Sequence, residues 1–534
     1  MTHSTRVWIL LSAFIILPAA AHSENEDLEG WPIVAIEFER YDIFDTTNPK
    51  TKAWFYRWAN ALHIISKEDF LRSMLLFKEG DPYSQDIADE SARILRALGI
   101  MNPVEIRAKR VPGGVAVTVE THDQWTLKIG GQLGLFGNRA DYSFDVEEEN
   151  LLGLGKAAGV AYASDSERDT WSFYYFDPNI FRSRWQLRLL HENLSDGSRD
   201  LVRIDRPFYS LATRWTWGVE GRREELIDYL YSESESVVHG NRDSESWRIW
   251  SGARLPGGAT ITRRLVAGWE HQQNTYSDWI WEDSATPYPP PEDRFIDGPT
   301  LSYEQIADRF IVVKGFRAWS VQEDVALGPN FSISSLWSAP AFGGDRKRLL
   351  LAGGFHAARQ RDGWLVLGDA WLSGRVEDIG VRNMVAGVQL GAAQLGSNGW
   401  QIRLLAETSH ELDTDRQLTL GADVGLRGWD PDYFDGTGRA VLNIQWRKLI
   451  KEEFLGLFSV GVVIFGDAGV TWQPRVGPDT NGVRLDAGAG LLFDLAHLGR
   501  STLLRVDAAL PDDGSGLTVT VSTSAIFRLP RRNR

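Results

Sequence analysis

The 534-residue chain contains no cysteine and only four methionines, and its acidic residues outnumber its basic ones. Because cysteine is absent, disulfide bonds, thiolate metal sites and a cysteine nucleophile are excluded. The 57 Lys and Arg against 72 Asp and Glu leave a formal net charge of −15, which argues against a general nucleic-acid binder. After the N-terminal region, no run of apolar residues approaches the ~18 that a membrane-spanning helix needs.

Residues 1–21 have the pattern of a secretory signal peptide. Arg6 supplies a positive charge, residues 7–17 form an apolar run, and three small residues at 19–21 satisfy the cleavage rule. The apolar run has eleven residues, about half of the ~20 that would span a bilayer. We therefore expect cleavage near His22 and a mature protein that works outside the cytoplasm.

Residues 31–122 predict a small α+β domain. Val34, Ile36 and Phe38 alternate with polar neighbours, as in a strand. Helical patterns follow at 54–63 and within 67–99, and two further strands flank the turn at 112–114. The order β-α-α-β-β over roughly 90 residues is enough for one core. No nucleophile and base cluster here, so these residues indicate packing rather than catalysis.

The remainder, residues 124–534, predicts an antiparallel barrel. Segments of roughly 8 to 12 residues alternate apolar and polar side chains between clusters of turn-forming residues. The polar faces carry Arg, Asp, Gln or Asn, and together with export this favours lipid outside and water inside. The number of such segments is close to 16, which leaves about 26 residues for each strand and turn and predicts a 16-stranded transmembrane β-barrel with generous loops. The 22 Trp and 14 Tyr fit aromatic girdles, and the absence of a fixed-period repeat disfavours the competing β-solenoid or propeller.

Two segments predict a polar contact inside the barrel. Residues 418–426 alternate so that their apolar side chains would face lipid, which turns Arg427 toward the lumen, and a long loop follows at 430–438. Later, the same alternation through residues 458–464 places Phe465, Asp467 and Gly469 inside. We expect Arg427 to pair with Asp467, because a guanidinium in the lumen needs a carboxylate or water. Two independently solvated charges are the alternative.

At these residues the chain resembles the BamA/TamA and two-partner-secretion transporter superfamily, which are outer-membrane barrels of 16 strands preceded by periplasmic POTRA domains. The family's aliphatic-Arg-Gly-aromatic motif, at the head of its long sixth loop, matches Leu426, Arg427, Gly428 and Trp429. Its Phe-x-Asp-x-Gly motif on a late strand matches Phe465, Asp467 and Gly469. The resemblance implies that Arg427 docks against Asp467 and Phe465 and holds the loop inside the barrel.

The N-terminal unit resembles one POTRA domain through residues 75–96, and residues 149–155 resemble the turn after the family's second barrel strand. There are two departures. Only one POTRA-like unit is visible, whereas the assembly insertases carry several and the secretion transporters usually two. The chain also continues past Phe527 with a basic tail, where many such barrels end.

The resemblance implies an outer-membrane barrel that inserts outer-membrane proteins or translocates polypeptides across that membrane, with its N-terminal domain in the periplasm. The first strand, at 125–136, would meet the last, at 517–527, in a seam that can open. Expected partners are unfolded outer-membrane or secreted client polypeptides, periplasmic accessory proteins and outer-membrane lipid, but no nucleic acid. A passive or substrate-specific channel with a POTRA-like scaffold is the alternative. We expect no enzyme activity, cofactor or metal, because no Ser/His pair or metal-ligand spacing is recognisable.

Overall fold

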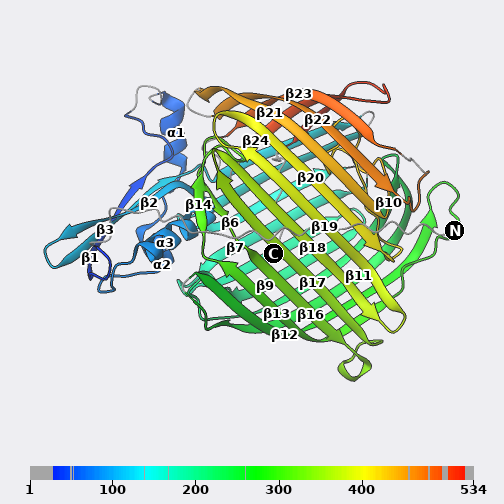
Figure 1. Ribbon diagram of the computed structural model, residues 1–534, viewed down its shortest axis with the longest axis horizontal. Coiled ribbons are helices and arrows are strands. Elements are labelled where there is room, and N and C mark those ends of the chain that lie inside the picture. The colour runs from blue at the N-terminus through cyan, green and yellow to red at the C-terminus, as the bar shows by residue number, and fades with distance from the viewer. Residues whose placement is uncertain are drawn as a thin grey trace.

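The computed structural model shows a small N-terminal domain at one end of a large closed barrel (Figure 1). It describes residues 28–47, 51, 53–136, 139–165, 167–258, 260–454, 458–478, 482–495 and 503–522. The signal peptide predicted at residues 1–21 and the tail after residue 522 lie outside the described residues.

The N-terminal domain packs helices on one three-stranded sheet. Its elements are β1 (Ile33–Tyr41), α1 (Trp54–Leu62), α2 (Glu68–Met74), α3 (Gln85–Ala97), β2 (Met101–Val111) and β3 (Gly114–Asp123). The sheet order is β1-β3-β2, with β1 parallel and β2 antiparallel to β3. Alternate residues of β3 are fully buried beneath Leu71 of α2 and Leu95 of α3. The second predicted helical region is thus two helices, and α3 is followed by Gly99 in the left-handed conformation (φ +78°).

The barrel is built from antiparallel neighbours in chain order. Its first half consists of β4 (Leu127–Phe136), β5 (Arg139–Leu151), β6 (Lys156–Ser164), β7 (Asp169–Ile180), β8 (Trp185–Leu194), β9 (Gly197–Arg206), β10 (Trp215–Ser232), β11 (Glu235–Leu255), β12 (Ile261–Trp281) and β13 (Arg294–Ala307). The second half consists of β16 (Asn330–Ser338), β17 (Arg348–Arg361), β18 (Trp364–Glu377), β19 (Gly380–Gln394), β20 (Asn398–His410), β21 (Gly438–Phe454), β22 (Phe458–Trp472), β23 (Arg484–Asp494), β24 (Leu503–Pro511) and β25 (Thr518–Ser522). The barrel closes between β25 and β4.

The predicted count of sixteen strands is wrong, because these two runs of ten strands make twenty among the described residues. The prediction assumed generous loops, whereas several connections are very short. Only residues 233 and 234 join β10 to β11, and only residues 362 and 363 join β17 to β18. Shorter turns leave room for four more strands in the same length of chain.

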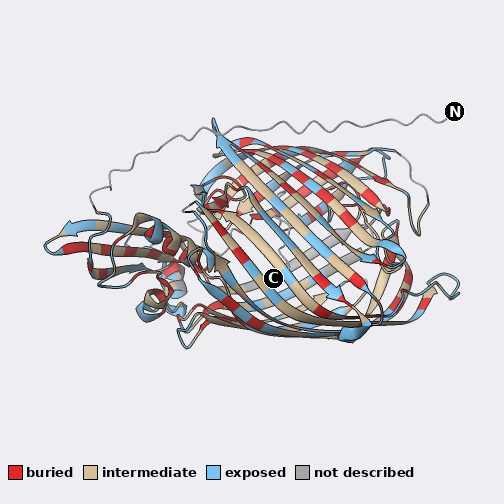
Figure 2. Ribbon diagram, turned by 60° about the horizontal axis from the view of Figure 1, so that its bottom comes forward, coloured by how far each residue is buried: buried red, intermediate tan, exposed pale blue. Residues whose placement is uncertain are grey.

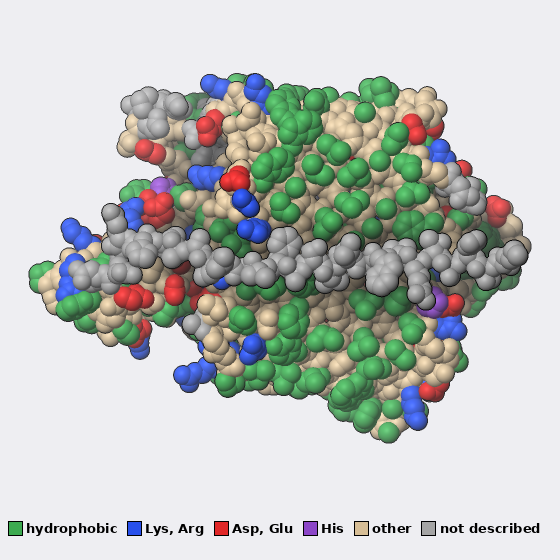
Figure 3. All heavy atoms as spheres, in the orientation of Figure 1, with side chains coloured by type: hydrophobic (Ala, Val, Ile, Leu, Met, Phe, Trp, Pro, Cys, Tyr) green, Lys and Arg blue, Asp and Glu red, His purple; other side chains and the backbone are tan. Residues whose placement is uncertain are grey.

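The outer face of the wall is apolar, and its inner face is polar. On β22, the side chain of Ile464 faces outward and is 54% exposed. Asp467, three residues later, faces the lumen and is 3% exposed. The same contrast separates Leu510 (58%) from Asp507 (2%) on β24. Figure 2 shows the resulting alternation along the strands, and Figure 3 shows apolar side chains spread over the barrel wall with charged groups toward its two ends. An apolar surface of this extent suits hydrocarbon and not water.

No helix in the described part of the chain could span a membrane, because each is too short or too polar.

The N-terminal domain contacts the barrel end that we call proximal; the opposite end is distal. Residues 152–155, which join β5 to β6, lie against the domain, where the Lys67 N–H donates to the Gly153 carbonyl at 2.8 Å. Gly155 is in the left-handed conformation (φ +64°), and a Cβ there would lie 2.2 Å from the Phe70 ring. A side chain at this position would therefore push the domain away from the wall.

A charge on the outer face should destabilise the barrel. Ile464→Arg places a guanidinium in hydrocarbon, and we expect it to lower the free energy of unfolding in lipid vesicles by about 2–4 kcal/mol. Urea titration of the reconstituted protein measures the change. Lys448→Arg, an exposed position on β21, is the matched control and should change little. An unaltered stability of the Ile464→Arg variant would place this face in water.

Candidate functional site: a loop folded into the barrel

The connection between β20 and β21, residues 411–437, folds back into the barrel. Leu420 and Leu426 are fully buried, and the backbones of Leu420 and Phe434 exchange two hydrogen bonds of 2.7 and 3.0 Å. The N–H groups of Val424, Gly425 and Leu426 all donate to the carbonyl of Gly421, which closes a tight turn. Counting from β4, this is the eighth connection at the distal end, not the sixth that the resemblance implies.

The predicted lipid-facing strand at 418–426 is wrong. Only an isolated bridge forms there, and the apolar side chains of the segment join a cluster within the barrel. The buried members of that cluster are Leu405, Leu420, Leu426, Trp429, Phe434 and Val441. The Trp429 ring lies 4.8 Å from the Phe434 ring in an edge-on arrangement. Alternation is therefore real, but an internal apolar cluster takes the place of lipid.

Arg427 carries the polar contact that fixes the loop to the wall. Its Nε and Nη2 donate to the two carboxylate oxygens of Asp467 on β22, at 2.7 and 2.8 Å. Its Nη1 donates to Gln445 of β21 at 3.2 Å, and its guanidinium carbon lies 3.5 Å from the centre of the Phe465 ring. The contact expected between these residues is present, in the two-pronged geometry that matches a guanidinium to a carboxylate.

The wall completes the hydrogen bonding of this ion pair. Asn443 Nδ2 donates to Asp467 at 2.7 Å and to the carbonyl of Gly425 at 2.5 Å. Asp507 lies 3.7 Å from Arg427 and accepts a hydrogen bond from Arg505. Each of these side chains is buried, so the pair depends on its neighbours rather than on bulk water.

The glycines of both motifs allow close approach. Gly428 donates its N–H to Asp486 of β23 at 2.9 Å, and a Cβ on it would lie 2.6 Å from the Asp486 Cβ. The Gly428 carbonyl accepts a hydrogen bond from Thr518 of β25 at 2.9 Å. On β22, a Cβ at Gly469 would lie 2.9 Å from the Leu420 side chain. Both glycines therefore leave space that the loop and the wall fill.

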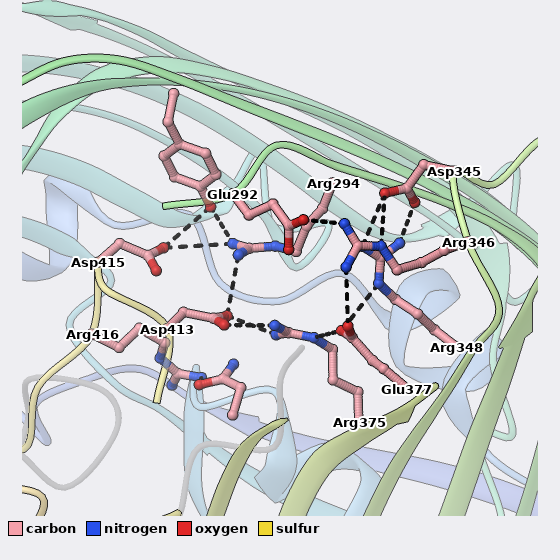
Figure 4. Close-up of polar contacts among 12 residues, drawn as sticks. Glu292, Arg294, Asp345, Arg346, Arg348, Arg375, Glu377, Asp413, Asp415 and Arg416 are labelled. Atoms are coloured by element: carbon pink, nitrogen blue, oxygen red, sulfur yellow. Dashed lines mark hydrogen bonds and ion pairs between the residues drawn. The ribbon is translucent and has the colours of Figure 1, made fainter. Parts of the chain in front are cut away.

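The base of the loop has a second set of ion pairs, which the sequence reasoning missed. Arg375 of β18 binds both carboxylate oxygens of Asp413 at 2.6 and 2.5 Å, and Arg294 of β13 lies 3.2 Å from the same carboxylate. Figure 4 shows how this set continues from loop to wall through Glu377 and Arg348. Strand alternation places such residues inside, but it does not show which of them face the loop.

The sequence reasoning also missed three wall residues that contact the tip of the loop or its ion pair, namely Asn443, Asp486 and Thr518. Each lies on the polar phase of its strand, so a signal was present, but only the register of the strands brings them to the loop. Within the described ranges, no group of three or more His, Asp or Glu side chains could hold a metal ion.

Solved structures that match the chain are barrels with low sequence identity to it. BamA from Haemophilus ducreyi lacking POTRA domains 1–3 matches at 14% identity over 91% of this chain and 83% of that one, with a TM-score of 0.37. CdiB from Acinetobacter baumannii matches at 10% identity over 92% and 73% of the two chains, with a TM-score of 0.43. CdiB from Escherichia coli matches at 12% identity over 94% and 92%, with a TM-score of 0.44. No family model and no curated protein matches the chain.

Breaking the buried ion pair should cost far more than breaking an exposed one. Arg427→Ala or Asp467→Ala leaves an uncompensated buried charge, and we expect a loss of about 3–5 kcal/mol in the free energy of unfolding. Arg382→Ala breaks the exposed pair with Glu411 and should cost less than about 1 kcal/mol.

The charge-reversed double variant Arg427→Asp with Asp467→Arg should recover part of the loss, because opposite charges again face each other. If the reversed variant is no more stable than the weaker of its two single variants, the pairing is not what holds the loop.

Proposed function

We propose that the chain is an outer-membrane protein whose barrel inserts outer-membrane proteins or translocates polypeptides across that membrane. The main support for this proposal is that the tip of the inward loop binds the strands next to the seam at which the barrel closes. Arg427 binds β22, and Gly428 binds both β23 and β25. A contact that ties several strands beside a seam can control whether that seam opens.

The seam lies where the barrel pairs its two terminal strands. β25 pairs with β24 through residues Thr518 to Ser522, and the barrel closes between β25 and β4. A terminal strand is joined to the rest of the barrel at one end only, so the pairing of β25 with β4 can separate without breaking a turn at the seam. A separated strand exposes an edge on which a client strand can pair. Docking of the loop tip on Thr518 opposes that separation.

The N-terminal domain stands where it could deliver a client to the seam. β3 ends at Asp123 and β4, one of the two seam strands, begins at Leu127. The sheet order leaves β1 and β2 as edge strands in the described domain, and an extended polypeptide can add to such an edge. These features support a POTRA-like domain in the periplasm that receives unfolded clients. The function requires no catalytic residue or cofactor in the chain.

A passive or substrate-specific channel is the second candidate, and one observation favours it. A cavity of about 1060 Å³ lies within the barrel, lined by charged side chains that include Arg203, Arg242, Glu270 and Arg294. Water and ions would occupy a polar space of this kind. Ion conduction alone therefore does not separate the candidates, whereas an effect on client polypeptides does.

Reconstitution with an unfolded outer-membrane barrel tests client insertion. Liposomes that contain the protein should fold and insert the client faster than empty liposomes, with insertion followed by the gel shift of the folded client. Arg427→Ala should alter this rate, and Arg382→Ala should not. Secretion of an unfolded client into the same liposomes tests translocation. A protein that accelerates neither process but conducts ions would be a channel.

Cross-linking the seam separates the candidates in a second way. Because the chain has no cysteine, one cysteine in β4 and one at the facing position of β25 form the only possible disulfide. Oxidation should abolish the effect on clients and leave ion conduction intact, and reduction should restore the effect. Full client handling by the oxidised protein would exclude a mechanism that opens this seam.

A further inference from the structure

The connection between β13 and β16, residues 308–329, extends into the proximal mouth of the barrel. We call it the strap. It contains a two-stranded hairpin, β14 (Phe310–Val313) and β15 (Glu323–Ala326), that pairs with itself and not with the barrel sheet. The strap can therefore move without breaking the pairing of the barrel wall.

One part of the strap is built into the wall. The side chain of Trp319 is buried against Val463, Phe465 and Leu492 of β22 and β23. The backbone N–H groups of Trp319 and Ser320 donate to the Asp494 carboxylate at 2.5 and 2.7 Å. A Cβ at Gly461 would lie 2.3 Å from the Trp319 ring, so this glycine leaves the space that the ring occupies.

Arg447 of β21 fastens the adjoining residues. It is among the largest fully buried side chains, and it donates to the carbonyls of Gly315, Phe316 and Arg317, the last at 3.0 Å. Backbone carbonyls of the strap are thus hydrogen-bond partners of a buried wall cation. The strap crosses from its own strands, β13 and β16, to strands β21–β23.

The hairpin of the strap packs on the wall through Val313 and Val325, which are buried against residues of β18 and β19, and it is also bound to the N-terminal domain. Arg96 of α3 donates from Nε and Nη2 to the two carboxylate oxygens of Asp324, both at 2.7 Å. Asn102 of β2 and the backbone of Gln322 exchange two hydrogen bonds, at 3.1 and 3.2 Å. The Arg93 guanidinium also lies 4.2 Å above the ring of Phe310.

Strap and loop both contact the side chain of Phe465. Phe465 packs in the cluster that contains Trp319, and the same ring lies 3.5 Å from the Arg427 guanidinium carbon. A continuous series of contacts therefore runs from Arg96 through the strap to the ion pair that holds the loop.

We propose that the strap is an inner gate that the N-terminal domain holds closed. Movement of α3 and β2 away from the strap breaks the bonds to Asp324 and Gln322 and frees Trp319 to leave Phe465. The proximal mouth of the barrel then opens, and the packing of Phe465 against the Arg427 guanidinium weakens. β2 is one of the two edge strands of the domain's sheet, so a client that pairs with β2 acts on the strand that holds the strap. This regulation rests on the proposed function, but the gate itself can be measured without a client.

Charge reversal across the Arg96–Asp324 pair tests the gate. In planar bilayers, full-length protein with Arg96→Asp or Asp324→Arg should open roughly tenfold more often than wild type, because a two-pronged charged contact is lost. The double variant should return to the wild-type opening frequency. Arg107→Asp, which disrupts exposed ion pairs of the same domain, is the matched control and should conduct as wild type does.

Trp319→Ala is the second variant, because it removes the side chain of the gate and leaves the domain contact intact. It should open as often as the single reversals, with the gel shift of a folded barrel retained. The proposed gate would be overturned if both single reversals and Trp319→Ala conduct as wild type does. It would also be overturned if the double variant opens as often as the single reversals. If the gate results hold while wild type handles no client, the proposed function fails and the gate stands.

Discussion

The ion pair between Arg427 and Asp467 is the constraint on which the loop, the motif glycines and the seam contacts depend. Taking both charges out of water costs several kcal/mol per ion, and the mutual attraction offsets this only if the remaining hydrogen bonds are satisfied. The wall meets that condition with Asn443 and Gln445. Because the cost of desolvation and the attraction between the charges nearly cancel, the ion pair determines where the loop docks on the wall more than how tightly it docks. Burial of the apolar cluster around Leu420, Leu426 and Trp429 supplies most of the favourable free energy with which the loop docks on the wall.

Alternation along β22 predicted that Ile464 faces outward and Asp467 inward, and the exposure of the two side chains agrees. Strand number was less accessible because it depends on turn chemistry. Asp362 and Gly363 form a positive-φ turn of the kind that Asp-Gly predicts, but Glu233 and Ser234 adopt positive φ without that signal. For residues 418–426, alternation could not separate lipid from an internal apolar cluster, since both are apolar. Contacts such as Gly428 with Thr518 require strand register, which no local pattern contains.

The four unpredicted strands do not disturb the loop contacts. Among the described residues, fifteen barrel strands precede the loop and five, β21–β25, follow it. Every wall residue that binds Arg427 or Gly428 lies on β21–β25. Arg427 and Gly428 therefore bind strands that follow the loop in the chain, on the side of the closing seam.

A wider barrel needs more than one inward segment to fill it, because barrel diameter grows roughly in proportion to strand number. The loop reaches the wall at β21–β25, and its base is held by Arg294 of β13 and Arg375 of β18. The strap occupies the proximal mouth beneath it, with Trp319 against the same β22 residue that contacts Arg427. The two segments enter from opposite ends and share Phe465. A displacement of either one must therefore alter the packing of the other, which makes the lumen a coupled unit.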